Sequence, residues 1–309
     1  MDSMVTKELG RTGVLLPEIG LGTWLYHGGP SPLRKGLEAG ALFIDTAESY
    51  GTEAVVGEAV RGMRDRVCIA TKVSPQNFRQ QDLKRSADAS LKKLGIDSID
   101  LFQLHWPNPA IPIEETMGAM ADLVDAGKVR YIGVSNFSVG QLEKAQQALG
   151  KRQIVSNQVR YSLIDRTIET GLIQYCQAHH ITVIAYSPLG HEFSRIRDCD
   201  PTGVIDELAR MTGKSPAQVA INWCLCKDGV VAIPKGNSTK HILDNCGASD
   251  WRLSQEQLVL LDSRIQYQQR SQFGMLVRQL VRQWMPGPLK PLAVRAVKAL
   301  PRGLRSWVQ

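Results

Sequence analysis

The chain has 309 residues, of which 43% are hydrophobic and 22% are charged. Values this close to the average of soluble globular proteins exclude disorder over most of the length. No stretch of about 18 residues is apolar throughout, so the sequence predicts no membrane-spanning helix. The N-terminus has no apolar run and is not expected to be a secretory signal.

The net charge of +7 comes almost entirely from the C-terminal end of the chain. Residues 270–309 contain eight Lys and Arg side chains and no Asp or Glu. Subtracting these eight from 37 basic residues leaves 29 against 30 acidic ones in residues 1–269, a net charge of −1. A nearly neutral body lacks the basic surface of nucleic-acid-binding domains, so we expect no nucleic-acid partner.

Six cysteines are spread through the chain, at positions 68, 176, 199, 224, 226 and 246. They form no CxxC pair, which argues against a zinc site and against a disulfide framework. We therefore expect reduced thiols, no bound metal and a cytoplasmic location, because disulfides are rare in reducing compartments.

The first predicted element is a small β-hairpin, in which Val5–Leu9 and Val14–Leu16 flank the turn at residues 10–13. Eight short β-rich runs follow, separated by segments with helical periodicity such as Gln80–Leu94 and Ile113–Ala126. The runs are mostly apolar, as is typical of strands buried on both faces. In chain order they are Glu18–Thr23, Leu42–Asp45, Val67–Lys72, Ile99–His105, Tyr131–Val134, Ile154–Asn157, Thr182–Tyr186 and Val230–Pro234.

Alternation of eight strands with helices predicts an eightfold (β/α) TIM barrel, closed at one end by the N-terminal β-hairpin. A doubly wound open sheet is the alternative, but its GxGxxG phosphate turn is not matched, since Gly20 and Gly22 are followed by Leu25. No linker divides the body, and the α/β alternation stops near Arg264. We therefore predict a barrel domain over residues 1–264 and a C-terminal helical extension over residues 265–309.

The extension is predicted to form two basic amphipathic helices, over residues 271–285 and 289–305, on either side of a Pro-Gly-Pro break at residues 286–288. Two interpretations remain open. In one, the apolar faces pack on the barrel and the charges are solvated. In the other, the extension contacts an acidic partner or the surface of an anionic membrane, which would make the protein membrane-peripheral.

Polar side chains follow three consecutive predicted strands, at the end of a barrel where active sites are found. The second strand ends at Asp45 and is soon followed by Tyr50, the third ends at Lys72, and the fourth ends at His105. A neighbouring ammonium lowers the pKa of a tyrosine, and a carboxylate holds that ammonium in place. Together these side chains predict a proton donor for a carbonyl oxygen.

Each of these four residues also has a structural interpretation when taken alone. Asp45 is suited to cap a turn, and Tyr50 is suited to pack at the rim. Lys72 could be a solvated charge and His105 a core histidine. The convergence of four chemically complementary groups on one rim favours the catalytic interpretation.

Three motifs make the chain resemble the aldo-keto reductase family. They are Asp45-Thr46-Ala47-x-x-Tyr50-Gly51, Leu91-x-x-Leu94-x-x-x-x-Ile99-Asp100-Leu101-x-x-x-His105-Trp106-Pro107 and Gly127-Lys128-Val129-Arg130-x-Ile132-Gly133-Val134-Ser135-Asn136-Phe137. The resemblance covers the chain from about Thr6 to about Arg264. It implies that Tyr50 is the general acid and that Asp45, Lys72 and His105 are its catalytic partners. It also implies that a nicotinamide cofactor supplies a hydride.

The resemblance further implies where the cofactor binds. Tyr186, at the end of the seventh strand, would stack on the nicotinamide ring, and Ser135, Asn136 and Gln158 would bond its carboxamide. Without the resemblance, such polar residues are also typical of turns. The other expected cofactor contacts are Gly22, Thr23, Trp24, Asp45, Ser187, Leu189, Ile233, Lys235, Asn237, Ser238, His241, Asp244 and Asn245.

The choice between NADPH and NADH depends on the segment after the eighth strand. Lys235 is placed to bind the 2′-phosphate of NADPH. His241 stands where many members of the family carry Arg, which forms a planar, permanently charged fork on phosphate. Lys240 is adjacent and can compensate. We expect NADPH as the cofactor, with NADH as the alternative.

Trp24, Tyr50, His105 and Trp106 are expected to shape an aromatic substrate pocket. The resulting interpretation is NADPH-dependent reduction of an aldehyde or ketone, a small-molecule carbonyl, by a cytoplasmic monomer. The alternative is a redox-sensing subunit that binds nicotinamide with little turnover. Isomerase chemistry on the same barrel is a weaker interpretation, because the sequence indicates neither a metal cluster nor a phosphosugar site.

Overall fold

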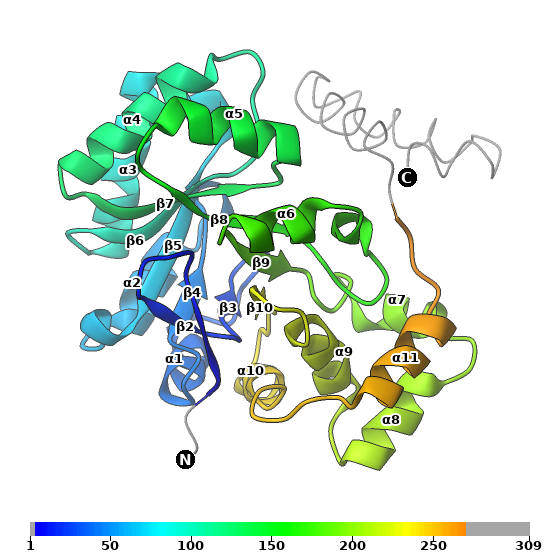
Figure 1. Cartoon of the computed structure of the whole chain (residues 1–309). Helices are drawn as coiled ribbons and strands as arrows, with labels where there is room; N and C mark the ends of the chain where they lie inside the picture. The colour runs from blue at the N-terminus through cyan, green and yellow to red at the C-terminus, as the bar shows by residue number, and fades with distance from the viewer. Residues whose placement is uncertain (1–3, 270–309) are drawn as a thin grey trace, which may run out of the picture.

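The predicted eightfold (β/α) barrel is confirmed by the computed structural model, which describes residues 4–269 (Figure 1). Neighbouring strands follow one another in chain order from β3 to β10. The ring closes where Ile19 pairs with Ala232 and the Gly20 amide donates to the Ala232 carbonyl over 2.8 Å. The strands are β3 Leu21–Gly22, β4 Phe43–Asp45, β5 Cys68–Val73, β6 Ile99–Leu104, β7 Val129–Ser135, β8 Ile154–Arg160, β9 Thr182–Tyr186 and β10 Val230–Ile233.

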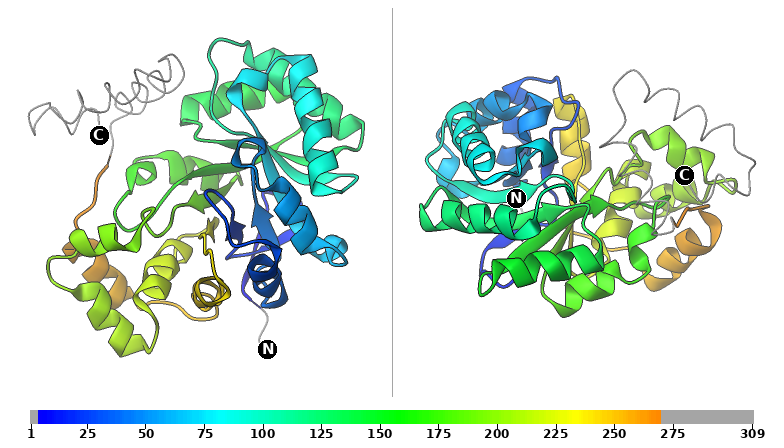
Figure 2. Two further views of the ribbon diagram at one scale, coloured as in Figure 1. Left: turned by 180° about the vertical axis from the view of Figure 1, so that it is seen from behind. Right: turned by 90° about the horizontal axis from the view of Figure 1, so that it is seen from above.

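Helices surround the strands, as the views from behind and from above show (Figure 2). Serine capping boxes begin α5, α9 and α11, with Ser138, Ser215 and Ser254 at the N-cap positions. The helices are α1 Pro30–Glu38, α2 Glu53–Val60, α3 Gln80–Leu94, α4 Ile113–Asp125, α5 Val139–Leu149, α6 Leu172–Ala178, α7 Phe193–Asp198, α8 Val204–Thr212, α9 Pro216–Leu225, α10 Thr239–Cys246 and α11 Gln255–Arg264.

Two strand boundaries differ from the sequence prediction in a way that matters for the site. The first strand is shorter than predicted, because only Leu21 and Gly22 join the β4 ladder. β8 is longer and ends at Arg160, three residues past its predicted end. Apolar periodicity ends where side chains become polar, but backbone pairing continues, with Gln158 opposite Ile184 and Arg160 opposite Tyr186.

The barrel interior is divided into an apolar layer and a polar layer. The apolar layer contains Leu9, Leu16, Phe43, Ala70, Leu101, Val155, Ile184, Val231 and Ile233. Two residues beyond Phe43, Ala70 and Leu101, the inward-facing positions are Asp45, Lys72 and Gln103. The polar layer therefore rests on a closed apolar floor, which keeps water from reaching it from below.

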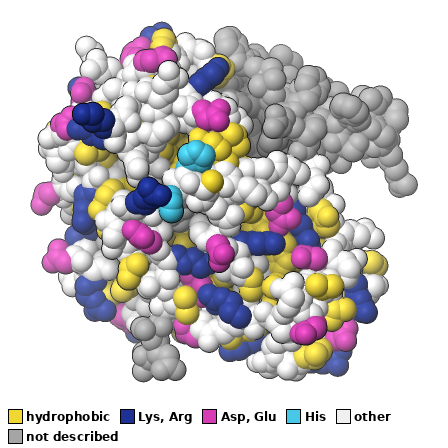
Figure 3. All heavy atoms as spheres, in the orientation of Figure 1, with side chains coloured by type: hydrophobic (Ala, Val, Ile, Leu, Met, Phe, Trp, Pro, Cys, Tyr) yellow, Lys and Arg dark blue, Asp and Glu magenta, His cyan; other side chains and the backbone are white. Residues whose placement is uncertain are grey.

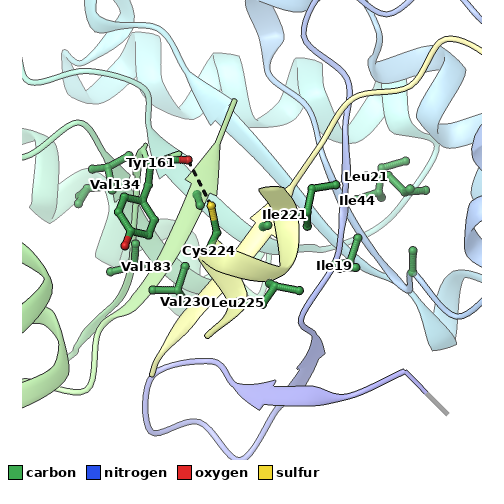
Figure 4. Close-up of a cluster of buried hydrophobic side chains, with 14 of the residues drawn as sticks. Ile19, Leu21, Ile44, Val134, Tyr161, Val183, Ile221, Cys224, Leu225 and Val230 are labelled. Atoms are coloured by element: carbon green, nitrogen blue, oxygen red, sulfur yellow. Dashed lines mark hydrogen bonds between the residues drawn. The ribbon is translucent and has the colours of Figure 1, made fainter. Parts of the chain in front are cut away.

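A second apolar layer fills the space between the strands and the outer helices. Figure 4 shows part of it, with Ile221, Cys224 and Leu225 of α9 and with Val183 of β9 and Val230 of β10. These side chains are at most 2% exposed. Burial on both faces fixes the strands, so the residues at their ends are held in place.

The predicted N-terminal hairpin is present and closes one end of the barrel. Its strands are β1 Thr6–Glu8 and β2 Leu15–Pro17, which pair in antiparallel fashion. The Lys7 ammonium donates to the carbonyls of Leu225, Lys227 and Val230, over 2.7, 3.2 and 2.7 Å. These bonds fasten the hairpin to the end of α9 and the start of β10.

The chain stays attached to the barrel through Gln268. The Gln268 amide donates to Ile164 O, and its carbonyl accepts from the Arg166 amide, each over 3.1 Å. The two basic helices predicted for 271–285 and 289–305 lie outside the described residues. The division between a barrel over 1–264 and an extension over 265–309 therefore stays a prediction.

The surface of the described body carries both signs of charge. Lys and Arg side chains are interspersed with Asp and Glu on the face seen in Figure 3. This mixture agrees with the net charge near zero calculated for residues 1–269. Within residues 4–269, no helix combines the length and the apolar character needed to cross a membrane.

Replacing Lys7 with Met should destabilise the barrel. The substitution keeps much of the side-chain volume but leaves three backbone carbonyls without their charged donor, at a cost of about 2 kcal/mol. The free energy of unfolding, measured by urea titration, should fall by that amount. Lys35→Met removes an exposed surface pair with Glu38 and should change it by less than about 0.5 kcal/mol. Equal stability of the two variants would contradict the role of Lys7.

Candidate active site

A buried ion pair lies at the centre of the polar layer. Lys72 is 0% exposed and Asp45 is 2% exposed. The Lys72 ammonium donates to Asp45 Oδ1 over 2.5 Å and to the Thr46 carbonyl over 2.8 Å. Burial alone would lower the pKa of Lys72, but Asp45 and Tyr50 outweigh burial and raise the pKa above its ordinary value. The amine is therefore an ammonium at neutral pH.

Tyr50 lies between this ammonium and His105. It ends a short 3₁₀ helix, Glu48–Tyr50, which follows β4. Its hydroxyl is 3.3 Å from His105 Nε2, and the two rings meet edge to face with centroids 5.4 Å apart. The Lys72 ammonium is 4.8 Å from the centre of the Tyr50 ring. The structure thus brings together all four residues predicted to be catalytic.

The predicted acidity of Tyr50 is wrong in direction. Burial raises the pKa of Tyr50 above its ordinary value of 10.0, and the Lys72 ammonium offsets only part of that increase. Desolvation disfavours the phenolate more strongly than the neighbouring charge favours it, and the Asp45 carboxylate opposes ionisation as well. Tyr50 therefore keeps its proton through the neutral range, as a proton donor must.

The residues expected to contact a carboxamide gather beside this group. Ser135 Oγ donates to the Gln158 carbonyl over 2.8 Å. The Asn136 side-chain amide donates to the His105 carbonyl over 3.1 Å, and its oxygen accepts from the Tyr186 hydroxyl over 3.0 Å. Asn136 and Ser187 both have positive φ, 65° and 52°, which is uncommon outside glycine and is found at functional sites.

The residues expected to bind phosphate lie around the start of α10. Ser238 is the N-cap residue and accepts from the His241 amide over 3.3 Å. Lys235, Lys240 and His241 are exposed there. A helix N-terminus with exposed cationic side chains suits an anionic group.

Several predicted cofactor residues make contacts within the protein. Thr23 is fully buried and donates to the Asp45 carbonyl over 2.9 Å. Asp244 accepts from the Ser215 hydroxyl over 3.1 Å, and the Asn245 amide donates to the Lys235 carbonyl over 3.5 Å. A Cβ on Gly22 would lie 2.6 Å from the Ile233 carbonyl oxygen, so this glycine permits the close approach of two strands.

Trp24 and Trp106, two of the residues predicted to shape a substrate pocket, lie on loops that follow β3 and β6. Trp24 is 46% exposed, and its ring centroid is 5.3 Å from that of His191. Trp106 follows β6 directly after His105 and is half-buried. Asn237 Oδ1 accepts from the His27 amide over 3.3 Å, which ties the Trp24 loop to the segment after β10. Leu189 is half-buried on the loop after β9.

Sequence reasoning missed Gln103, which is 0% exposed and donates to Asp45 Oδ2 over 3.2 Å. A signal for it exists in the sequence. Gln103 is a polar residue between Phe102 and Leu104, and the period of two places it on the same side as His105. The buried hydroxyl of Thr52 was also missed, and it bonds the hydroxyls of Thr23 and Thr46 over 2.9 and 2.8 Å.

The donor set fits a nicotinamide dinucleotide. Tyr186 offers a half-buried aromatic ring at the end of β9, beside amide and hydroxyl groups that match a carboxamide. A Cβ on Gly236 would lie 2.9 Å from the Ile242 amide nitrogen, so the turn before α10 packs closely on the helix start. Among residues 4–269, no three His, Cys, Asp or Glu side chains are grouped so that they could hold a metal ion.

Comparison with known proteins gives the same result as the donor set. A family model described as "Aldo/keto reductase family" matches residues 18–266. Methylglyoxal reductase YeaE from Escherichia coli is 39% identical over 261 residues, which cover 81% of this chain and 91% of that protein. Aldo-keto reductase YhdN from Bacillus subtilis is 34% identical over 276 residues, covering 73% of this chain and 82% of that protein.

Solved structures extend the similarity to the fold. An aldo-keto reductase from Klebsiella pneumoniae in complex with NADPH has a TM-score of 0.79 at 38% identity, covering 87% of this chain and 98% of that one. The thermostable aldo-keto reductase Tm1743, in complex with the inhibitor epalrestat, has a TM-score of 0.78 at 40% identity, covering 84% and 99%. Neighbours are solved with NADP and with NADPH, the cofactors of this family. This chain belongs to the aldo/keto reductase family.

Proposed function

We propose that this protein reduces an aldehyde or ketone to the alcohol with NADPH, and that Tyr50 donates the proton. The observation that carries the proposal is the Tyr50 hydroxyl, 3.3 Å from His105 Nε2 and beside the buried ammonium of Lys72. This arrangement offers a protonated phenol with a cation close by, which is what a carbonyl oxygen needs as it gains electron density.

The roles of the chain's own residues follow from their positions. NADPH, when bound, supplies the hydride that reduces the carbonyl carbon. His105 Nε2 orients the carbonyl oxygen towards the Tyr50 hydroxyl, which gives up its proton to that oxygen. The Lys72 ammonium stabilises the phenolate left behind, and Asp45 keeps the ammonium in place. Solvent then returns the proton to Tyr50.

The relatives support a small carbonyl as substrate. The Escherichia coli relative is named a methylglyoxal reductase, and the Klebsiella pneumoniae neighbour was solved with NADP and acetate. The complete set of four polar residues favours turnover over the alternative of a nicotinamide-sensing subunit. NADPH oxidation across a panel of aldehydes separates the two, because a sensor would bind the cofactor with negligible turnover.

The cellular compartment and the oligomeric state of the protein are also proposals. All six cysteines are free thiols, which supports a reducing compartment such as the cytoplasm. The four proposed catalytic residues all come from one chain, which supports a monomer. Contact of the basic extension with an anionic membrane or an acidic partner rests on its charge alone.

Tyr50→Phe should lower kcat for aldehyde reduction about 1,000-fold, since general acid catalysis typically contributes between 10² and 10⁴. The dissociation constant for NADPH, measured by fluorescence titration, should stay within about twofold, because the ring is kept. Tyr26→Phe is the matched control, since the Tyr26 hydroxyl donates to the Gly29 carbonyl instead. Full activity of Tyr50→Phe would reject the donor role.

The pH profile of carbonyl reduction should be flat through neutral pH. The donor must be protonated, and burial raises the pKa of Tyr50 above 10.0, so kcat/KM should fall only above about pH 10. A fall centred near pH 7 would instead identify an imidazole as the donor. Circular dichroism at each pH checks that the fold is intact.

Lys235→Ala should reduce the preference for NADPH over NADH about 10-fold, because one charge-assisted bond to the 2′-phosphate is lost. The ratio of kcat/KM for the two cofactors measures this preference. Lys144→Ala changes an exposed lysine on α5 and should leave the ratio unchanged. An unchanged ratio in Lys235→Ala would show that the phosphate is bound elsewhere.

A further inference from the structure

Gln103 carries a buried amide that the proposed catalytic residues do not account for. It lies on β6, opposite Lys72 on β5 and opposite Gly133 on β7. Its side chain is 0% exposed, in a strand whose every residue is buried. Burying a primary amide costs free energy unless its donors and acceptor are bonded, so its partners indicate what it does.

Those partners form a closed ring of three side chains. Gln103 Nε2 donates to Asp45 Oδ2 over 3.2 Å, and Gln158 Nε2 donates to the same oxygen over 2.8 Å. Gln158 Nε2 also donates to Gln103 Oε1, over 3.4 Å. The other carboxylate oxygen of Asp45 accepts from Lys72. One carboxylate thus bonds the Lys72 ammonium through Oδ1 and the two amides through Oδ2.

The barrel provides room for the Gln103 side chain. Gly133 is its neighbour on β7, and a Cβ there would lie 3.0 Å from Gln103 Cγ and 2.4 Å from Ser156 Oγ. Any larger residue at 133 would therefore push against the side chain of Gln103. Because residue 133 is glycine, the Gln103 side chain has room to extend to Asp45.

The ring determines which way the Gln158 amide faces. An ionised carboxylate only accepts hydrogen bonds, so both glutamines must turn their NH₂ groups towards Asp45. The two hydrogens of Gln158 Nε2 are then used by Asp45 and by Gln103 Oε1. The Gln158 oxygen must therefore point away from the ring, where it is complementary to an NH₂ donor.

We propose that Gln103 is a positioning residue of the nicotinamide site. By donating to Asp45 and accepting from Gln158, it holds the Gln158 amide in the orientation that accepts a hydrogen bond from the carboxamide of NADPH. Gln103 acts through Gln158 and Asp45. The inference rests on the proposed function in so far as NADPH is the ligand.

Binding of two ligands tests the proposal. NADPH carries the nicotinamide, whereas 2′,5′-ADP has the adenine and phosphate groups without it. Gln103→Met keeps the volume and removes both hydrogen bonds, so the dissociation constant for NADPH should rise about 10-fold, while that for 2′,5′-ADP stays within about twofold. Isothermal titration of both ligands measures this. Equal weakening of both, or unchanged NADPH binding, would overturn the role of Gln103.

Ser156→Ala is the matched control. Ser156 is also 0% exposed in the barrel interior, and its Oγ has no hydrogen-bond partner among the described residues. It lies beside Gly133 but outside the ring. Both ligands should bind this variant as they bind wild type, and selective loss of NADPH affinity in it would also overturn the proposal.

Gln103→Glu provides a second test that does not depend on how well the methionine variant folds. A protonated glutamic acid donates to Asp45 and accepts from Gln158, whereas a second carboxylate repels Asp45. The charged groups around position 103 are Asp45, which it contacts, and Lys72, its neighbour on β5; the Tyr50 ring lies next to the Lys72 ammonium and contacts His105. Relative to wild type, NADPH affinity should be several-fold higher at pH 6 than at pH 8. A pH dependence identical to that of wild type would contradict the ring.

These binding measurements separate the two proposals. A wild-type chain that binds NADPH but reduces no aldehyde rejects the proposed turnover, and the role of Gln103 is still decided by the two ligands. Unchanged NADPH binding in Gln103→Met rejects the role of Gln103 whatever the turnover of wild type.

Discussion

The buried pair of Lys72 and Asp45 is the interaction on which the site depends. Two opposite charges, 0% and 2% exposed, lie inside the barrel, where each ion would cost several kcal/mol to desolvate without compensation. Compensation comes from the 2.5 Å contact between them and from the Thr46 carbonyl on the ammonium. Two glutamine amides bond the remaining carboxylate oxygen. Removing either charge would leave the other buried and unpaired, so the pair must be retained as a unit.

The layered interior of the barrel holds such a buried ion pair in place. Phe43, Ala70 and Leu101 belong to the apolar layer. Because side chains two residues apart in a strand point to the same side, the residue two positions after each of them lies in the polar layer, with the same strand geometry. The hairpin closes the floor from below with Leu9 and Leu16. Charges are thus held on rigid strands, while Tyr50 lies on a short helix at the rim. Preorganised groups of this kind need little rearrangement as charge develops on a substrate.

Much of this could be predicted from sequence, for identifiable reasons. Apolar runs located all eight strands, and the ends of three of them located Asp45, Lys72 and His105. Strand pairing past an apolar run could not be predicted, as β8 shows, because polar side chains at a barrel rim leave backbone bonding intact. The direction of the Tyr50 pKa shift was missed because charge proximity can be inferred from motifs, whereas the depth of burial cannot. Gln103 was missed because one polar residue in a strand reveals no partner until three strands are placed together.

The central claim is that one carboxylate serves both the proton donor and the nicotinamide site. The most direct measurement is kcat for aldehyde reduction together with the NADPH dissociation constant in Asp45→Asn. The account predicts that both change together: turnover falls by at least about 100-fold as Lys72 loses its counter-ion, and NADPH binding weakens as the glutamine ring loses its acceptor. Loss of turnover with unchanged NADPH binding, or normal turnover, would contradict it.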